Sequence, residues 1–220
     1  QPPQRAALVG RRKAVEVIGL DKTYVSSGGW FKPDRRVEAA KEVNFTILQG
    51  ETLGLVGESG SGKSSVARLI KRLIEPDRGT VRVGDTDFTA IEGKELRKER
   101  SRIQMIFQDP FASLNPRRKV GNIIADGPIA HGTDPAAAGA RARELLEMVG
   151  LNVNAMDRFP HEFSGGQRQR IGIARALALE PEIIVADEAV SALDVSVQAQ
   201  VLKLLEDLKE RLGLSVLFIT

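Results

Sequence analysis

The feature that most constrains this sequence is a glycine-rich segment between an apolar run and an amphipathic run. It fits the pattern G-x-x-x-x-G-K-[ST] and consists of Gly57-Glu58-Ser59-Gly60-Ser61-Gly62-Lys63-Ser64. Residues 52–56 before it predict a short strand, and 65–74 after it predict a helix with Val66, Leu69, Ile70 and Leu73 on one face. A strand, a loop and a helix in this order can cradle phosphate, because the helix start presents unpaired N–H groups. A chance glycine-rich turn is the alternative, and the flanking strand and helix argue against it.

Within this cradle, two side chains carry the chemistry. We expect Lys63 to reach the β- and γ-phosphates of a nucleotide and the Ser64 hydroxyl to bind Mg²⁺. The residues expected to surround the phosphates are Gly57, Glu58, Ser59, Gly60, Ser61, Gly62 and Ser65. Kinases, GTPases, helicases and many ATPases share this chemistry, so the loop alone leaves the function open.

A second candidate element is the apolar run 183–186, which ends in Asp187 and Glu188. Carboxylates at the carboxyl end of a buried strand face the crevice where ligands bind in open α/β sheets. Asp187 suits the Mg²⁺ shell, directly or through water, and Glu188 is placed to orient or deprotonate an attacking water. The alternative is a solvated strand end before a helix, where acids are favoured anyway. Lys63 and Ser64 in the same chain favour the metal site.

Composition narrows the classes of partner. The 220 residues are 42% hydrophobic and 28% charged, which is typical of a globular domain with its own core. No run approaches the roughly 18 apolar residues of a membrane-spanning helix, so we expect any membrane role to be peripheral. The 32 basic and 29 acidic residues are scattered, which argues against nucleic acid as a partner. The absence of cysteine fits a reducing compartment.

The order of the patterned segments predicts the fold class. Strands separated by helices indicate an α/β domain with a largely parallel sheet. Apolar runs that indicate strands lie at 14–18, 43–48, 52–56, 81–83, 103–107, 183–186 and 216–219. Between 109 and 163 no strand is evident, and helical patterns at 120–124 and 136–149 are punctuated by Pro110, Pro116, Pro128 and Pro135. We interpret this segment as an inserted helical subdomain.

A third motif, Phe163-Ser164-Gly165-Gly166-Gln167, opens a helical pattern over 167–179 whose inner face holds Ile171, Ala174, Leu177 and Ala178. Ser164 is a candidate N-cap, and the glycines leave backbone donors bare. An ordinary capped helix is the alternative. Its position shortly before Asp187 argues against that reading, as does Gln108 at the end of an apolar run between the two nucleotide motifs. The set of motifs resembles the ABC ATPase family over most of the chain.

The resemblance implies a P-loop NTPase core with a mostly parallel sheet, flanking helices and an antiparallel N-terminal β part. Residues 14–108 and 164–220 would form this core, 109–163 the helical subdomain, and 1–13 a tail or linker. In the family, two such domains sandwich two ATP molecules, with the phosphate loop of one facing the signature helix of the other. The cofactors implied are therefore ATP and Mg²⁺.

Further site residues follow from the resemblance alone. Gln108 would contact Mg²⁺ and sense the γ-phosphate. The signature residues Ser164, Gly165, Gly166 and Gln167 would contact the nucleotide of the partner domain, and Phe163 replaces the more usual leucine. Asp194 would lie in the loop that crosses the dimer seam. Tyr24 would stack on adenine, or would be a packed strand-end aromatic instead.

Three blocks resemble the oligopeptide and dipeptide importer ATPases: 108–117, 160–163, and 187–194 with Ala189-Val190 in place of the usual Pro-Thr. The resemblance implies transport-coupled ATP hydrolysis, peripherally at the cytoplasmic face of the cell membrane. Expected partners are a second ABC ATPase domain in a homo- or heterodimer, transmembrane permease subunits and, indirectly, an extracytoplasmic solute-binding protein. Phe111 and Leu114 are expected to contact the membrane subunits.

Other readings and residues stay open at this point. A non-transport ABC ATPase that acts in DNA repair or on ribosomes is one alternative, although 109–163 is short and lacks heptads. A nucleotide-dependent regulatory module without turnover is another, and Glu188 argues against it. The two histidines, His131 and His161, lack the spacing of a metal pair. Trp30 and Phe31 indicate a self-packed loop or a partner contact.

The sequence ends at Leu217-Phe218-Ile219-Thr220. In the resembled family, a histidine that contacts the γ-phosphate follows such a strand almost at once. We therefore expect that the chain is truncated before this histidine, that it binds Mg-ATP and that it hydrolyses it poorly. Loss of one preorganised contact to a transferring phosphate costs roughly 10²- to 10³-fold in rate. A second hypothesis is that the chain belongs to a longer fused protein.

Overall fold

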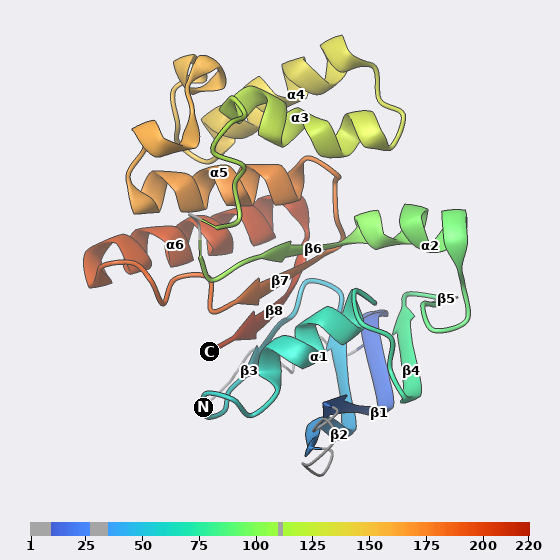
Figure 1. Ribbon diagram of the computed structural model, residues 1–220. Coiled ribbons are helices and arrows are strands. Elements are labelled where there is room, and N and C mark those ends of the chain that lie inside the picture. Colours follow the sequence, from blue (N-terminus) through green and yellow to red (C-terminus); the bar gives the residue numbers. More distant parts are fainter. Residues whose placement is uncertain (1–9, 27–34, 110–111) are drawn as a thin grey trace.

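Two four-stranded sheets contain the strands of the described residues, which are 10–26, 35–109 and 112–220 of the computed structural model (Figure 1). One sheet is antiparallel, in the order β2-β1-β4-β5, and the other is parallel, in the order β3-β8-β7-β6. The predicted α/β class, with an antiparallel N-terminal part and a parallel sheet, is confirmed.

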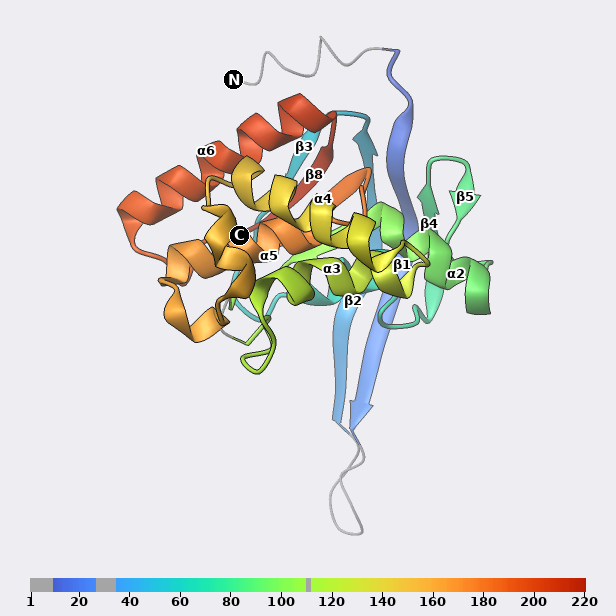
Figure 2. The same cartoon turned by 90° about the horizontal axis from the view of Figure 1, so that it is seen from above.

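The antiparallel sheet is built on a long hairpin. Its strands are β1 (Lys13–Ser26), β2 (Arg35–Leu48), β4 (Arg78–Val83) and β5 (Thr86–Asp87). The far end of the hairpin extends beyond the rest of the molecule (Figure 2). There Val25 and Val37 are exposed on both strands, so the outer half lacks the inward-facing apolar alternation that marks a half-buried strand. This is why the sequence predicted only 14–18 and 43–48.

The parallel sheet places four strand ends along one edge. Its strands are β3 (Thr52–Leu55), β6 (Ile103–Ile106), β7 (Ile183–Asp187) and β8 (Ser215–Ile219). Leu55 and Asp187 both lie opposite Ile219, and Ile106 lies opposite Ala186. Because the strands are parallel and in register, the segments that follow β3, β6 and β7 emerge side by side at the carboxyl edge.

Two hydrophobic cores lie on the two faces of the parallel sheet, and β7 contributes to both. Ile184 and Ala186 belong to the core under the helices, whereas Ile183 and Val185 belong to the core shared with α1 and the antiparallel sheet. The alternation follows from the period of two in a strand. Every residue of β7 is buried because both faces are covered.

The helix after the phosphate loop is shorter than predicted and starts earlier. It is α1 (Lys63–Ile70), and its buried positions include Val66, Leu69 and Ile70 as expected. The assignment of Leu73 to the inner face is wrong, because Leu73 is 49% exposed. The reason is local: Arg72 adopts a left-handed conformation with φ of 53°, which ends the helical path before Leu73.

Of the other helices, α2 (Gly93–Glu99) contributes Leu96 to the core shared with α1, and the rest contribute to the core on the opposite face of the sheet (Figure 1). The rest are α3 (Val120–Ala130), α4 (Pro135–Met148), α5 (Gly165–Leu177) and α6 (Val195–Leu212), and short 3₁₀ turns lie at Arg100–Arg102, Val153–Asp157 and Pro160–Glu162. The described residues between 112 and 163 contain no strand. The predicted domain boundaries remain a prediction.

Two expectations for this helical segment are wrong. Pro128 lies inside α3 rather than at a boundary, so the helix continues past it without the backbone bond that its missing N–H would have donated to Ile124 O. Leu114 is 2% exposed and belongs to the core that includes Ile124 and Leu145. Its side chain therefore cannot contact a membrane subunit, because apolar packing inside the helical segment already covers it.

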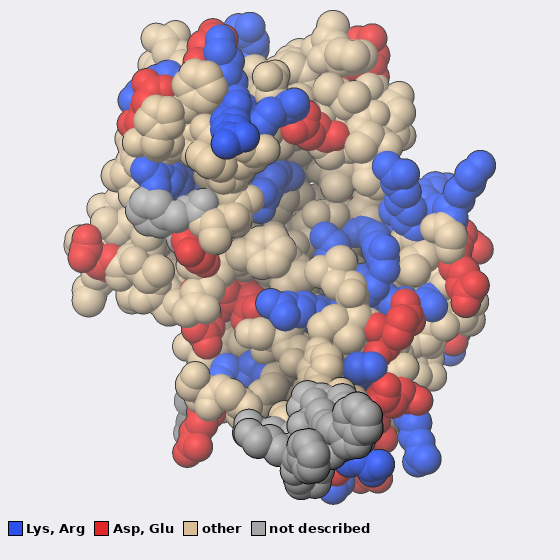
Figure 3. Space-filling view, viewed as in Figure 1, with Lys and Arg blue, Asp and Glu red and all other residues tan. Residues whose placement is uncertain are grey.

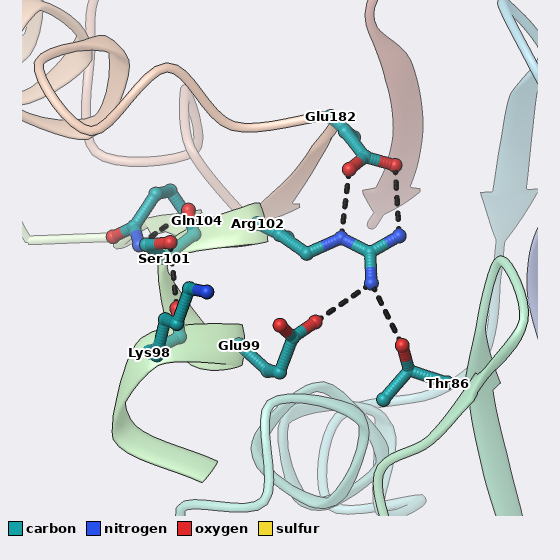
Figure 4. A network of polar contacts seen from close by, with 7 residues as sticks. All are labelled: Thr86, Lys98, Glu99, Ser101, Arg102, Gln104 and Glu182. Atoms are coloured by element: carbon teal, nitrogen blue, oxygen red, sulfur yellow. Dashed lines mark hydrogen bonds and ion pairs between the residues drawn. The ribbon is translucent and has the colours of Figure 1, made fainter. Parts of the chain in front are cut away.

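At the amino edge of the parallel sheet, Arg102 connects the two sheets (Figure 4). Its guanidinium donates to both oxygens of Glu182 at 2.7 and 3.1 Å, and to Glu99 at 2.7 Å and the Thr86 hydroxyl at 3.2 Å. The hydrogen bonds to Glu182 and Glu99 raise the pKa of Arg102. Glu182 precedes β7 of the parallel sheet and Thr86 lies in β5 of the antiparallel sheet, so the planar guanidinium of Arg102 connects the two sheets by hydrogen bonds.

The charged side chains do not segregate on the face shown in Figure 3. There Lys and Arg are interspersed with Asp and Glu over the described residues. This distribution matches the near balance of basic and acidic residues in the sequence.

Candidate nucleotide site

The phosphate loop connects β3 to α1 and encloses the ammonium group of Lys63. Lys63 is buried, and its Nζ donates to the carbonyl oxygens of Gly57 at 2.5 Å and Glu58 at 2.8 Å. A buried ammonium needs such acceptors because desolvation is costly without them. The loop therefore holds a positive charge at the start of α1, where the predicted phosphate contact requires it.

The start of α1 is open to an anion because Gly62 is its N-cap. Gly62 has φ of 93° and no side-chain cap, and a Cβ there would lie 1.9 Å from the carbonyl oxygen of Ala39 in β2. Only glycine fits both the left-handed backbone and this close approach. The first N–H groups of α1 are thus left without a side-chain partner and can bind phosphate oxygens.

The predicted metal ligands meet at the carboxyl edge of the sheet. The Ser64 hydroxyl donates to Asp187 Oδ1 at 3.0 Å, although 123 positions separate them. Ser64, Gln108 and Asp187 line one cavity of about 380 Å³, together with Arg68, Phe107, Asp109, Ala112 and Ser113. A hydroxyl, an amide carbonyl and a carboxylate are oxygen donors, which hard cations such as Mg²⁺ prefer. The donor set therefore fits the implied metal.

Glu188 follows Asp187 directly and has an unusual backbone. Its φ is 46°, a left-handed value that few residues other than glycine adopt. The Glu188 N–H donates to Ile219 O at 3.0 Å, and the Glu188 carbonyl accepts from both the N–H and the hydroxyl of Ser191 at 3.0 Å. These bonds stabilise the strained conformation and fix where the carboxylate leaves the backbone.

The signature segment is well formed but lies outside this cavity. Ser164 is the N-cap of α5, as predicted: its hydroxyl accepts from the Gln167 N–H at 3.3 Å, and Gln167 Oε1 accepts from the Ser164 N–H at 3.0 Å. Gly166 packs against α6, where a Cβ would lie 2.5 Å from Val197 Cγ1. None of Ser164, Gly165, Gly166 and Gln167 lines the cavity that contains Asp187.

Two other predicted contacts lie at the periphery. Tyr24 lies on β1 opposite Val37 and is 38% exposed, and Lys22 Nζ is 5.9 Å from its ring centroid. Asp77 holds this stretch by accepting from Lys22 Nζ at 2.8 Å and the Thr23 N–H at 2.7 Å, and these hydrogen bonds lower the pKa of Asp77. The ring is thus accessible for stacking, and its role stays a prediction.

Asp194 is the exposed N-cap of α6 and makes no side-chain cap bond. An exposed carboxylate at this position is available to another chain, and its proposed role at the dimer seam stays a prediction. Residues 1–9 of the expected tail, Trp30, Phe31 and Phe111 lie outside the described residues.

Each histidine has a local contact. His161 stacks on Phe159 with ring centroids 5.8 Å apart, and His131 Nδ1 lies 2.9 Å from Gly127 O at the end of α3. Among the described residues, no group of three His, Cys, Asp or Glu side chains could hold a metal ion. Among the three proposed metal ligands Ser64, Gln108 and Asp187, the carboxylate is that of Asp187.

The sequence motifs missed one residue near the site, Gln169 of α5. It is 2% exposed, and its Nε2 donates to Ala189 O at 2.5 Å and to Phe107 O at 3.4 Å. The signal was present in the sequence: apolar residues surround Gln169 on several faces of α5, which is typical of a buried helix. A polar side chain on such a helix needs an internal partner.

These features define a P-loop nucleotide-binding domain: a phosphate loop between a strand and a helix, and an acid on a neighbouring strand bonded to the loop serine. The ABC transporter family model matches residues 40–191. The chain belongs to the ABC transporter family.

Three relatives found in sequence comparison carry peptide-transport names. A Brucella ovis ATP-binding protein named for peptide import is 51% identical over 94% of this chain and 63% of its own length. The oligopeptide transport ATP-binding protein OppF of Streptococcus mutans is 48% identical over 95% of this chain and 67% of its length. The dipeptide transport ATP-binding protein DppF of Haemophilus influenzae is 46% identical over 94% of this chain and 63% of its length. The chain thus spans about 63% of the first of these relatives.

Solved structures share the fold. The dimeric ABC transporter cassette MJ0796 superposes with a TM-score of 0.80 at 31% identity, covering 94% of this chain and 87% of that one. A dimeric post-hydrolysis structure of the same cassette, bound to ADP and Pi, gives a TM-score of 0.80 at 32% identity with the same coverage. No helix among the described residues is long and apolar enough to cross a membrane.

Proposed function

We propose that this chain is the ATP-binding and ATP-hydrolysing part of a subunit that energises an importer of peptides or related small solutes. The observation that carries the proposal is the Ser64–Asp187 hydrogen bond of 3.0 Å, at an edge where Gln108 lines the same cavity. It joins the phosphate loop to the acidic strand end, as a metal-nucleotide site requires. The peptide-import names of the relatives support the cargo class.

The residues have separable roles in this mechanism. Lys63 and the first N–H groups of α1 bind the β- and γ-phosphates, and Ser64, Gln108 and Asp187 would hold Mg²⁺. When bound, Mg²⁺ neutralises charge that develops on the phosphate oxygens. Glu188 orients the attacking water and accepts its proton, and its fixed backbone limits where that water lies. Positioning supplies most of the catalysis in this scheme.

The second half of the site would come from another ATPase domain. The signature residues Ser164 and Gln167 are exposed, their side chains bond reciprocally to each other's backbone N–H groups, and neither residue lines the cavity at Asp187. An outward-facing helix N-terminus with bare glycine donors suits a phosphate held by a neighbouring chain. The dimeric cassette structures of the same fold support a sandwich arrangement.

The permease subunits would contact the segment after Gln108 and the helical region. A cavity of about 560 Å³ lies between this segment and the helical region. Its lining includes Phe107 and Ser113, which also line the nucleotide cavity, and three cations, Lys71, Arg118 and Arg175. A segment bound there would touch residues adjacent to Gln108, which gives nucleotide state a route to the membrane subunits. In this proposal the chain would lie peripherally at the cytoplasmic face of the membrane.

The test is Mg-dependent ATP hydrolysis by the full-length protein with its partner subunits, compared with the Glu188→Gln variant. Removing a general base lowers turnover by about 10²- to 10⁴-fold. The variant should still bind ATP, because Lys63 and the loop are unchanged. Equal turnover in both proteins would refute the role of Glu188. ATP binding without turnover in either protein would support a regulatory module instead.

A further inference from the structure

The buried side chain of Gln169 connects three parts of the site that are far apart in sequence. Gln169 lies on α5, five positions after the N-cap Ser164. Its amide nitrogen donates at 2.5 Å to the carbonyl of Ala189, which follows Glu188, and at 3.4 Å to the carbonyl of Phe107, which precedes Gln108. One amide group of the signature helix therefore bonds both the segment after the acidic strand end and the segment before Gln108.

The Ala189 carbonyl depends on this contact. Ala189 is 1% exposed and Gln169 is 2% exposed, so bulk water does not reach the pair. A buried carbonyl that loses its donor remains unsatisfied unless the backbone moves. Movement of Ala189 changes the backbone of Glu188, whose left-handed φ of 46° persists only where its surroundings hold it.

We propose that Gln169 is a positioning residue for ATP hydrolysis: it holds the Glu188 segment, and more weakly the Gln108 segment, in place relative to the signature helix. The inference rests on the proposed role of Glu188. The distances decide which segment depends more on Gln169, because a contact of 2.5 Å is much stronger than one of 3.4 Å. Loss of the amide therefore acts on kcat through Glu188, and ATP binding at Lys63 and Ser64 is retained.

Two substitutions separate positioning from packing. Gln169→Leu keeps a similar side-chain volume and removes the hydrogen-bond donor. It should lower kcat about 10- to 100-fold, because a displacement of a catalytic group by up to about 1 Å has an effect of this size. The KM for ATP should stay within about twofold, because the substrate contacts are intact. Gln169→Glu keeps the shape and can donate to Ala189 O only when its carboxyl is protonated.

The pH dependence of the Glu variant gives a readout that a packing role would not produce. The ratio of kcat in Gln169→Glu to kcat in wild type should rise as pH falls, since protonation restores the donor. The same ratio for Gln169→Leu should be constant with pH. Burial of the new carboxyl raises its pKa, so its protonation, and with it the rise of the kcat ratio, occurs closer to the pH range of the assay.

Arg170→Met is the matched control. Arg170 is the next residue of α5. Its side chain donates at 2.8 Å to the backbone carbonyl of Val149, the C-cap of α4, and not to the Glu188 segment. This variant should lower the melting temperature and leave kcat per folded protein within about twofold of wild type. It removes a side-chain-to-carbonyl bond from the same helix without touching the Glu188 segment.

The experiment measures kcat, the KM for ATP and the melting temperature of these variants and of Glu188→Gln, in the full-length protein with its partner subunits. The proposal is supported if kcat falls in Glu188→Gln and in the Gln169 variants but not in Arg170→Met, and if the ratio for Gln169→Glu rises at low pH. If Glu188→Gln abolishes turnover while Gln169→Leu behaves like Arg170→Met, the proposal alone is overturned. If Glu188→Gln keeps full turnover, the assignment of Glu188 fails and this inference fails with it. Should Gln169→Leu not fold, a flat pH ratio for Gln169→Glu overturns the proposal by itself.

Discussion

The phosphate loop and the signature segment are both glycine-rich helix starts, yet they satisfy their polar groups in opposite ways. Around the loop, Lys63 is buried and bonded to carbonyls of the loop itself, and Asp187 is buried and bonded to Ser64, 123 positions away in the sequence. In the signature, Ser164 and Gln167 are exposed and bond to each other across one turn. The first region is assembled by tertiary structure, and the second is preformed by a local capping box.

The difference indicates how a site can be divided between two chains. Buried charges are costly unless partners are in place, so the cationic half must be completed within one chain before any nucleotide arrives. An exposed capping box has no such desolvation cost, so it is stable in a single chain without a nucleotide from a partner. We therefore expect loss of the buried contacts around the loop to damage the isolated chain, and substitution of the exposed signature side chains Ser164 and Gln167 to affect mainly the assembled dimer.

The largest effect is expected from Gly62→Ala in the loop. The new Cβ would lie 1.9 Å from Ala39 O at a φ of 93°, so backbone strain adds to a steric overlap that β2 cannot relieve. Together these terms should lower the free energy of unfolding by about 4 kcal/mol and abolish ATP binding. Chemical denaturation and nucleotide titration measure both.

Gly60→Ala is the matched control for that prediction. Gly60 also has a positive φ, of 82°, but no atom lies within 4 Å of a Cβ built there. Only strain remains, so the cost should be about 1 kcal/mol. An equal loss of unfolding free energy in the two variants would show that the overlap with β2 does not contribute to the requirement for glycine at position 62.

The second prediction concerns Gly166→Ala in the signature, where the overlap is with a side chain of α6. The Cβ would lie 2.5 Å from Val197 Cγ1, and a β-branched valine has little rotamer freedom with which to move away. The expected cost is about 2–3 kcal/mol of unfolding free energy. Val197→Ala in the same chain should recover most of it, which a double-mutant cycle measures. A strictly additive result would contradict this packing account.

The sequence predicted those parts of the site that depend on local pattern. The phosphate loop, the two acids at the end of β7 and the N-cap at Ser164 each occupy a few consecutive residues whose chemistry can be recognised without knowledge of the fold. Leu73 was misplaced because a helical pattern does not reveal a left-handed residue such as Arg72, whose backbone conformation ends the helix early. Leu114 was expected at a partner surface because nothing local shows that it lies in the core with Ile124 and Leu145.

The sequence could not predict contacts between residues that are far apart along the chain. The bond between Ser64 and Asp187 and the contact of Gln169 with Ala189 depend on strand order, which periodicity does not determine. The same holds for the outer half of the β1–β2 hairpin, whose exposed Val25 and Val37 carry no inward-facing pattern. Burial of a polar residue is the clue that links such contacts to function.

The third prediction tests buried charge where partners are fewer than at Lys63. Lys71, just after α1, donates to Gln104 Oε1 at 3.1 Å, and burial, with the charges of Arg100 and Arg175, lowers the pKa of Lys71 to about 8. Because the unfolded pKa is 10.5, the unfolded chain binds more protons between pH 8 and 10.5, and the Lys71 contribution to stability rises over that window. Below pH 8 the group is charged in both states and its burial cost is constant.

Lys71→Met removes that cost. At pH 7 the unfolding free energy should rise by about 2 kcal/mol, which is the pKa shift converted to energy less one lost hydrogen bond. The gain over wild type should shrink as pH increases from 8 to 10.5, because wild type then loses the charge as well. Denaturation midpoints at several pH values check this. A gain that does not change with pH would indicate better packing rather than relief of a buried charge.

The smallest effect on stability, and the sharpest test of the comparison, is expected from Ser164→Ala. Loss of the cap should cost about 1 kcal/mol in the isolated chain, at the lower end because the cap bond is long at 3.3 Å. Asp134→Ala is the control, since Asp134 caps α4 by accepting from the N–H groups of Ala136 and Ala137 and lies outside the proposed site. Both variants should lose similar stability, but only Ser164→Ala should lower turnover, by roughly 10-fold, the cost of one lost hydrogen bond to a charged phosphate. If both variants keep full turnover, the exposed signature is a capped helix and nothing more, and the second half of the nucleotide site must lie elsewhere.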